Sequence, residues 1–279
     1  MKFSLGFSPC PNDTFIFDAL VNKKIDTEGI DFDIELDDVQ TLNNWAKEGK
    51  LDFSKISYGA LPQLLSQYAV LESGGALGVG VGPLLLAKES IDLKEVDTYK
   101  IAIPGKDTTA HMLFSLAFPH ANNKEFVVFN EVEDYVLDGK GLGVIIHENR
   151  FTYQKRGLHK LIDLGDYWEK TTGAPIPLGG IIAKRTLPKD VILQVDKLIN
   201  KSIAYAFENH KEHLAEFVKI HAQEMEESVM RQHIDLYVND FSLGLGEKGK
   251  KAIDKVLDVY QQLHPENTID RTKIFAKDL

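Results

Sequence analysis

The segment KFSLGFSPCPNDTFIFDALVNKK (2–24) predicts a strand, a stiff turn and a helix in close succession. KFSLGFS is the predicted strand and FIFDALVNKK the predicted helix. Two prolines around Cys10 restrict the turn to few conformations, and we expect Asn12, Asp13 and Thr14 to cap the helix. A strand that passes directly into a helix is the opening unit of an α/β fold.

The same alternation of strand and helix patterns continues along the first half of the chain, which is typical of a parallel or mixed sheet. A long β-like apolar stretch interrupts the alternation once, and the pattern then restarts. The predicted strands lie at 30–38, 51–57, 74–89, 100–105, 125–130 and 142–148, and the predicted helices at 41–50, 60–68, 108–119 and 131–140.

The chain changes character near its C-terminal third. IPLGGIIAKR (176–185) is predicted to cross back to the first unit, and helical patterns follow it. The organisation is α/β, with mixed sheets flanked by helices and a helical C-terminal part, and it resembles the two-lobed type II periplasmic-binding-protein fold. We expect residues 1–87 and 181–279 to form a larger lobe, 88–180 to form an inserted lobe, and a ligand cleft to lie between them.

The composition is that of a globular protein. The 279 residues are 43% hydrophobic and 27% charged, and the formal net charge is -10, which argues against a nucleic-acid partner. The N-terminus lacks a secretory pattern, and the most apolar stretch is too short to span a bilayer. We therefore expect a cytoplasmic protein with no membrane partner. The sequence leaves a homodimer open.

Three predicted strand-to-helix loops suit a small anion. Asn12 and Asp13 begin the first helix, whose free N–H groups favour negative charge. The loop Lys55-Ile56-Ser57 offers a cation and a hydroxyl, and the loop in IPGKDTTAHMLF offers Thr108 and Thr109. A structural interpretation stays open for each loop: a rigid cap at the first, a solvated Lys55 and a helix-capping Ser57 at the second, and simple N-capping at the third.

His147 is the candidate general base. GLGVIIHENRFTY (141–153) places it at the end of a strand predicted to be central, and histidine is the side chain best suited to take a proton near neutral pH. A lone histidine after an apolar run is more often structural. Three anion-type loops at the same sheet edge favour the catalytic interpretation.

Other features give weaker signals. The glycines of GALGVGVGP do not form a dinucleotide-binding pattern. His210 and His213 lack the carboxylate or cysteine partners of a metal site, so no metal ligands are predicted. A catalytic role for Cys10, the only cysteine, has no support in the sequence.

Four motifs resemble the 1,4-dihydroxy-6-naphthoate synthase family, which acts in the futalosine route to menaquinone. They cover the chain to about residue 185 and are SPCPNDTFIFDAL (8–20), SKISYGALP (54–62), GPLLLAK (82–88) and VIIHENRFTY (144–153). The combination of the first and last motifs is the specific part of the resemblance.

The resemblance implies a lyase that converts cyclic dehypoxanthine futalosine to 1,4-dihydroxy-6-naphthoate without a cofactor. The family's active-site histidine falls on His147 as proton acceptor. Its substrate-contact loops fall on the 55–57 loop and on Thr109 and Ala110.

Two other functions stay open. Chorismate dehydratase of the same pathway shares the fold, but the first and last motifs favour the synthase. A small-carboxylate-binding protein without catalytic activity would have no need of a base at the edge of the cleft.

Overall fold

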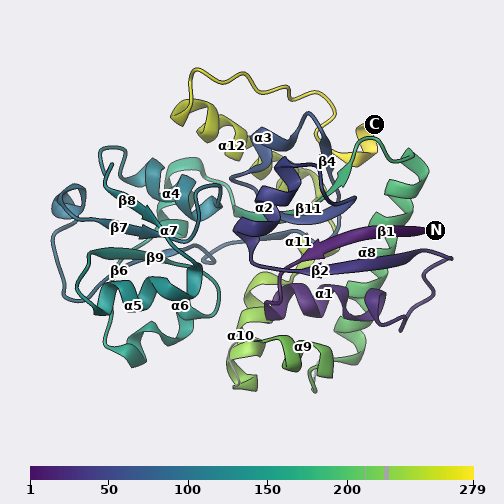
Figure 1. The fold of residues 1–279 in the computed structure, drawn as a ribbon, viewed down its shortest axis with the longest axis horizontal. Helices are drawn as coiled ribbons and strands as arrows, with labels where there is room; N and C mark the ends of the chain where they lie inside the picture. The colour runs from purple at the N-terminus through teal and green to yellow at the C-terminus, as the bar shows by residue number, and fades with distance from the viewer. Residues whose placement is uncertain (211, 223–225) are drawn as a thin grey trace.

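The computed structural model describes residues 1–210, 212–222 and 226–279 (Figure 1). Its strands are β1 (Lys2–Phe7), β2 (Asp31–Leu36), β3 (Phe53–Ser57), β4 (Tyr68–Val70), β5 (Ala76–Gly78), β6 (Leu84–Ala87), β7 (Ile101–Ile103), β8 (Lys124–Phe126), β9 (Leu142–Ile145), β10 (His159–Asp163) and β11 (Ile176–Lys184). Its α-helices are α1 (Pro11–Val21), α2 (Val39–Lys47), α3 (Leu61–Leu64), α4 (Thr109–Ala117), α5 (Val132–Leu137), α6 (Asn149–Thr152), α7 (Leu164–Thr172), α8 (Lys189–Asn209), α9 (Glu216–His221), α10 (Glu227–Tyr237), α11 (Asp240–Leu243) and α12 (Gly246–Leu263).

The first sheet, on the right in Figure 1, has the order β2-β1-β3-β11-β4, and β5 also pairs with β11. β1 is parallel to β2 and β3, as helical crossovers require. β11 runs antiparallel to β3, β4 and β5, because it returns from the second sheet. The predicted mixed α/β class is confirmed.

The second sheet, on the left in Figure 1, has the order β10-β6-β9-β7-β8. β7 is parallel to β8 and β9, whereas β6 is antiparallel to β9 and β10. Helix α4 follows β7, and the turn that carries His147 follows β9. The parallel neighbours β7 and β9 therefore bring two predicted loops to one sheet edge.

The chain changes sheets at residues other than the predicted lobe boundaries. β6 (84–87) pairs in the second sheet, although the predicted first lobe ends at 87. β11 pairs in the first sheet from residue 176, although the predicted return of the chain is at 181. The reason is that the apolar stretch 74–89 is not one strand: β5 and β6 have partners in different sheets. By strand pairing, we propose an inserted unit between β5 and β11.

Two local predictions are wrong. Asn12, Asp13 and Thr14 lie inside the first turn of α1, whose N-cap is Cys10 without a side-chain cap, because Pro11 sets the first helical position. The predicted helix at 60–68 shortens to α3, since Tyr68 already pairs with β11 as the start of β4.

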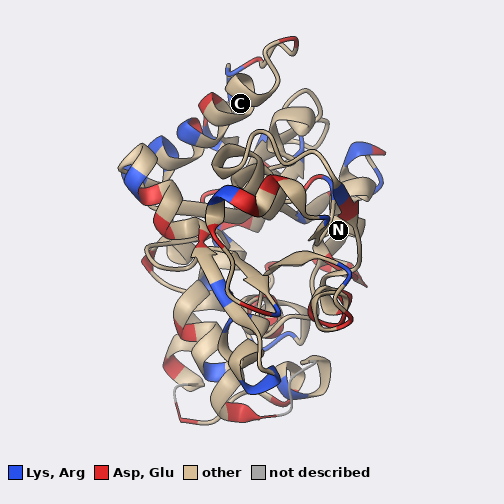
Figure 2. Cartoon of the chain, turned by 90° about the vertical axis from the view of Figure 1, so that its left-hand side faces the viewer, with Lys and Arg blue, Asp and Glu red and all other residues tan. Residues whose placement is uncertain are grey.

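The C-terminal helices pack against both units. α8, α9 and α10 contact α1, and α12 contacts β11 and α4. One buried apolar cluster contains side chains of both sheets, among them Ile56, Leu85, Ile101 and Ile176. Figure 2 shows acidic and basic residues interspersed over the surface elements of the chain. No helix of the described residues has the length and apolar character to cross a membrane.

Candidate active site

A pocket lies between the two sheets, with about 670 Å³ of empty space that is partly open to solvent. Its walls come from the end of β1 and the start of α1, the end of β3, the start of α4, the turn after β9, β11 and α10. The predicted residues Asn12, Asp13, Lys55, Ile56, Ser57, Thr108, Thr109, Ala110 and His147 all line this pocket. Segments far apart in the sequence therefore meet at one place.

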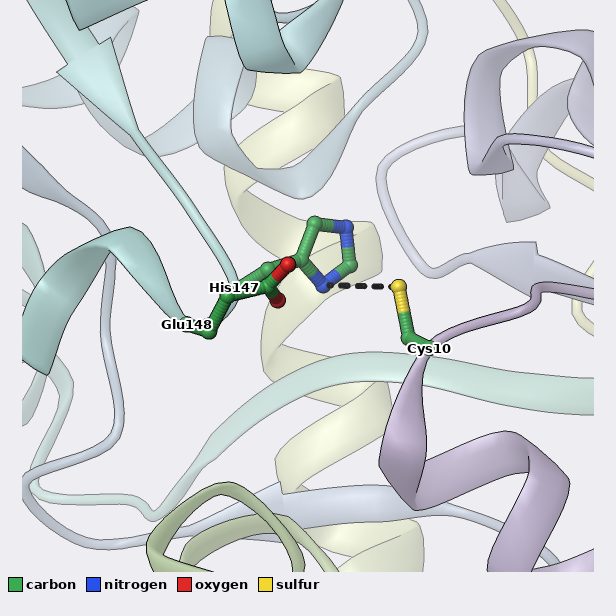
Figure 3. A group of neighbouring side chains, drawn as sticks. All are labelled: Cys10, His147 and Glu148. Carbon is green, nitrogen blue, oxygen red and sulfur yellow. Dashed lines mark hydrogen bonds between the residues drawn. The ribbon is translucent and has the colours of Figure 1, made fainter. Parts of the chain in front are cut away.

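The turn after β9 holds His147 in an uncommon backbone conformation. Its φ angle is 58°, in the left-handed region that non-glycine residues seldom adopt. Phe129 packs edge-on against the imidazole, with ring centroids 5.1 Å apart. Cys10 Sγ, at the start of α1, approaches His147 Nδ1 to 3.7 Å (Figure 3). Such strain persists where surrounding contacts hold the side chain in a functional position.

Arg150 anchors this turn to the segment that connects β5 and β6. Its guanidinium donates hydrogen bonds to the carbonyl oxygens of Gly80 and Gly82, between β5 and β6. It also pairs with Asp163 at 2.8 Å. The helical turn that follows His147 is thereby fixed to the frame of the second sheet.

Burial sets the protonation of the two facing groups. It lowers the pKa of His147, although the nearby carboxylates of Glu148 and Asp13 act in the opposite direction. Burial, helped by Glu148, raises the pKa of the Cys10 thiol well above its usual range. His147 is thus a neutral imidazole near neutral pH and Cys10 a neutral thiol, an arrangement that suits a base rather than a thiolate nucleophile.

Asp13 is the centre of a buried hydrogen-bond network at the start of α1. It accepts hydrogen bonds from the backbone and side chain of Ser8 and from the Asn12 amide. Lys55 Nζ lies 3.0 Å from its carboxylate and also donates to the Gly74 carbonyl oxygen. Lys55 is only 4% exposed, so the open alternative of a solvated lysine is wrong. Its charge is compensated by Asp13.

The end of β3 presents the Ser57 hydroxyl to the pocket. The Ser57 N–H donates to Asn43 Oδ1 at 2.9 Å, which fixes the backbone at this point. Its hydroxyl forms no hydrogen bond with another described residue, and α3 has Ala60 rather than Ser57 as its N-cap. Ser57 is therefore a polar group that a ligand can reach.

The start of α4 faces the pocket with backbone N–H groups rather than with free hydroxyls. Thr108 Oγ1 caps the helix by accepting from the His111 N–H and donates to the Gly105 carbonyl oxygen. Thr109 Oγ1 donates to the Leu178 carbonyl oxygen at 2.7 Å and accepts from the Gly59 N–H. Both threonine hydroxyls are therefore used in hydrogen bonds within the protein. The N–H groups of Thr109 and Ala110 belong to the first turn, where no helical partner exists.

Several pocket residues were not predicted from the sequence. His233 and Tyr237 line the pocket from α10, and Leu178 and Gly179 line it from β11. The available signal was weak: His233 lies on the apolar face of a helix whose pattern fits many folds. Only the tertiary packing of α10 against α1 brings His233 near His147.

Cys10, His147 and Glu148 offer donor atoms of the kinds that bind transition metals, and these atoms all lie within 4.8 Å of one another (Figure 3). A transition metal would take Cys10 as a thiolate. Without a metal, burial raises the pKa of this thiol and keeps it protonated.

Comparison with known proteins identifies relatives over nearly the whole chain. A family model described as "Menaquinone biosynthesis" matches residues 3–262. A 1,4-dihydroxy-6-naphthoate synthase of Thermus thermophilus is 43% identical over 253 residues, which are 90% of this chain and 91% of the relative. A protein of the same name from Streptomyces coelicolor is 43% identical over 260 residues, covering 91% and 90%.

Solved structures show the same fold. A crystal structure of an Archaeoglobus fulgidus protein superposes with a TM-score of 0.85 at 29% identity and covers 94% of this chain and 97% of its own. The periplasmic aliphatic sulphonate binding protein of Escherichia coli has a TM-score of 0.66 at 12% identity, covering 98% and 90%, and so shows the fold alone. The predicted periplasmic-binding-protein-like fold and the predicted family are both confirmed. The chain belongs to the menaquinone biosynthesis family, together with the 1,4-dihydroxy-6-naphthoate synthases of Thermus and Streptomyces.

Proposed function

We propose that this protein is a cytoplasmic carbon–carbon lyase that converts cyclic dehypoxanthine futalosine to 1,4-dihydroxy-6-naphthoate, with His147 as the general base. Membership of the menaquinone biosynthesis family and the names of the two relatives support the reaction. The single observation that supports the base is the position of His147: an imidazole kept neutral by burial, on the wall of the pocket between the sheets.

The proposed mechanism uses the protein's own acid–base groups. His147 removes a proton from the sugar-derived part of the substrate, and the carbon–carbon bond then breaks to release an aromatic hydroquinone. The Ser57 hydroxyl and the first-turn N–H groups of α4 bind the naphthoate carboxylate, because both are donors without a partner among the described residues. A base at this position contributes about a hundred- to ten-thousand-fold to the rate. These steps call for no metal or organic cofactor.

Enclosure between the sheets supports the same chemistry. The pocket walls come from both units, so the bound substrate is shielded from water on two sides. Lys55 and Asp13 both line the pocket and compensate each other's charge. Charge that develops on the substrate is therefore stabilised mainly by the donors at Ser57 and α4.

The experiment mixes purified protein with cyclic dehypoxanthine futalosine and follows products by chromatography with mass detection. We expect 1,4-dihydroxy-6-naphthoate from the wild type. His147→Asn should lose turnover by at least about a hundredfold while calorimetry still detects substrate binding. His159→Asn, at an exposed histidine of β10, is the matched control and should behave as wild type.

Each other outcome points to a named alternative. Tight binding without product would favour a small-carboxylate-binding protein, and neither binding nor product would make chorismate the next substrate to test. Full turnover by His147→Asn would show that another group is the base.

A further inference from the structure

The hydrogen bonds around Asn12 fix the tautomer of a second histidine, His233, which is fully buried. Asn12 Nδ2 donates to Asp13 Oδ1 at 2.8 Å, so the amide oxygen of Asn12 points the other way. That oxygen lies 2.8 Å from His233 Nε2. A carbonyl oxygen cannot donate, and His233 Nε2 must therefore carry the hydrogen. The reverse amide orientation would set two acceptors, the Asn12 oxygen and the Asp13 carboxylate, against each other.

The other nitrogen of His233 faces a carboxyl group. His233 Nδ1 lies 3.7 Å from Glu148 Oε2, and neither atom has a hydrogen-bond partner among the described residues. His233 is fully buried and Glu148 is 6% exposed. With Nε2 protonated, a neutral His233 offers only a lone pair at Nδ1, and an ionised Glu148 also offers only lone pairs. Two buried acceptors in this arrangement are unfavourable unless a proton lies between them.

The charged neighbours do not provide that proton. Lys55 is bound to Asp13, and Arg150 is bound to Asp163 and to two backbone oxygens. The remaining titratable groups near Glu148 are Cys10, His147 and Tyr237, all of which are influenced by its charge. Within the part of the chain that the structure describes, the close polar contact of His233 Nδ1 is with Glu148.

We propose that Glu148 and His233 share one proton by closing the 3.7 Å between them to hydrogen-bond distance, and that this bond makes them positioning residues for His147. The bond would join the turn after β9 in the second sheet to α10, which packs on the α1 side of the molecule. Glu148 follows His147 directly, so fixing its side chain also fixes the positive-φ backbone that aims the imidazole. His233 lies under the same imidazole, with the two rings nearly parallel and their centroids 6.0 Å apart.

The inference rests on the proposed role of His147, but its first test does not depend on turnover. Nitrogen-15 NMR of histidine-labelled wild-type protein reports the protonation of each ring nitrogen, and His233→Gln identifies the His233 signals. We expect a protonated Nε2 and an Nδ1 that is hydrogen-bonded or protonated. A bare Nδ1 without a hydrogen bond, or a neutral ring with its hydrogen on Nδ1, would overturn the proposal. So would a stoichiometric metal in the purified protein that shifts these signals.

The second test separates positioning from chemistry. In Glu148→Gln the amide N–H can donate to His233 Nδ1 without a titratable proton, so kcat should stay within a few-fold of wild type. Glu148→Leu removes the bond and should lower kcat by about a hundredfold with little change in KM, as expected for a misplaced base. Glu133→Leu is the matched control, because Glu133 is also a buried carboxyl of the inserted unit but lies outside the pocket.

The outcomes of the two tests are distinguishable. If Glu148→Gln is as slow as Glu148→Leu, the carboxyl itself takes part in the reaction and the positioning role is wrong. If Glu148→Leu does not fold, the kcat of Glu148→Gln and the NMR measurement still test the proposal. If wild-type protein does not turn over the substrate, the proposed function fails while the shared proton is still tested by NMR.

Discussion

His147 combines backbone strain with partial burial, and each has a separate consequence. The left-handed turn brings the imidazole close to Cys10, while desolvation disfavours its charged form. A residue held this way is already the neutral base that the proposed reaction requires. The adjacent Glu148 offsets only part of the effect of burial, so the pKa stays below the usual 6.5.

The pH dependence of kcat/KM follows from the direction of that shift. Because the pKa of His147 is lowered, more than half of the free enzyme still holds the neutral base at pH 6.5. We expect the acidic limb of the profile to fall below pH 6.5, as measured by initial rates with fold integrity followed by circular dichroism. An acidic limb at or above pH 6.5 in folded protein would contradict this assignment.

Cys10 should resist alkylation. Its raised pKa leaves little thiolate at neutral pH, and only the thiolate reacts quickly. Mass spectrometry after iodoacetamide treatment reads the result directly, because the chain has a single cysteine. Modification should be slow in native protein and fast after unfolding. Rapid labelling of the native protein at pH 7 would mean that the thiol is more acidic than its surroundings imply.

The sequence predicts those pocket residues that follow a local pattern, and it does not predict those whose place depends on tertiary contacts. The place of His147 in the pocket wall follows from a strand end, which is a local feature visible in VIIHENR. The two threonines were also found, but their hydroxyls proved to hold the fold: Thr108 caps α4 and Thr109 links Leu178 to Gly59. His233 was missed because its role depends on contacts with Asn12 and Glu148, which no local pattern reveals.

Helix α4 and strand β3 hold their polar side chains in different ways, which gives a matched pair of variants. Thr109→Val removes a hydroxyl with two internal hydrogen bonds and leaves the Gly59 N–H and the Leu178 carbonyl without that partner. It should lower the free energy of unfolding by about 1–3 kcal/mol. Ser57→Ala removes a hydroxyl that faces the pocket and should weaken substrate binding with little change in stability.

Urea unfolding and calorimetric titration of both variants check this pair. Equal stability loss in the two variants would show that Ser57 is also a structural residue. Unchanged substrate affinity in Ser57→Ala would move the proposed carboxylate site away from the end of β3.

The sequence predicts the strands and helices whose apolar residues recur with a clear period. It does not predict the elements whose bounds are set by pairing with strands far away in the sequence. β1, β2 and β3 alternate with helices α1 and α2 much as their patterns indicate. The stretch 74–89 was predicted as one β-like unit because apolar residues do not reveal which sheet they join. In the molecule the chain leaves the first sheet after β5 and enters the second at β6, with close contact between Gly82 and Gly165 at the crossing.

For the whole molecule, the main consequence is that one pocket and one apolar cluster contain residues of both sheets. The cluster joins side chains of β3 and β11 to side chains of β6 and β7. Part of the apolar core is therefore shared by the two sheets. Such sharing predicts that the two units unfold together.

Ligand-linked stability tests this coupling. A ligand that contacts both walls binds only when both sheets are assembled. The protein should therefore unfold in a single transition, and 1,4-dihydroxy-6-naphthoate should raise the midpoint temperature of that transition. At a ligand concentration of about 100 times Kd the free energy of unfolding should increase by about 2.7 kcal/mol. The Ser57→Ala variant should need more ligand for the same increase. Calorimetry across a ligand series measures both effects. Two transitions, of which the ligand moves only one, would show that a single sheet binds the product and that the shared cluster does not couple the units.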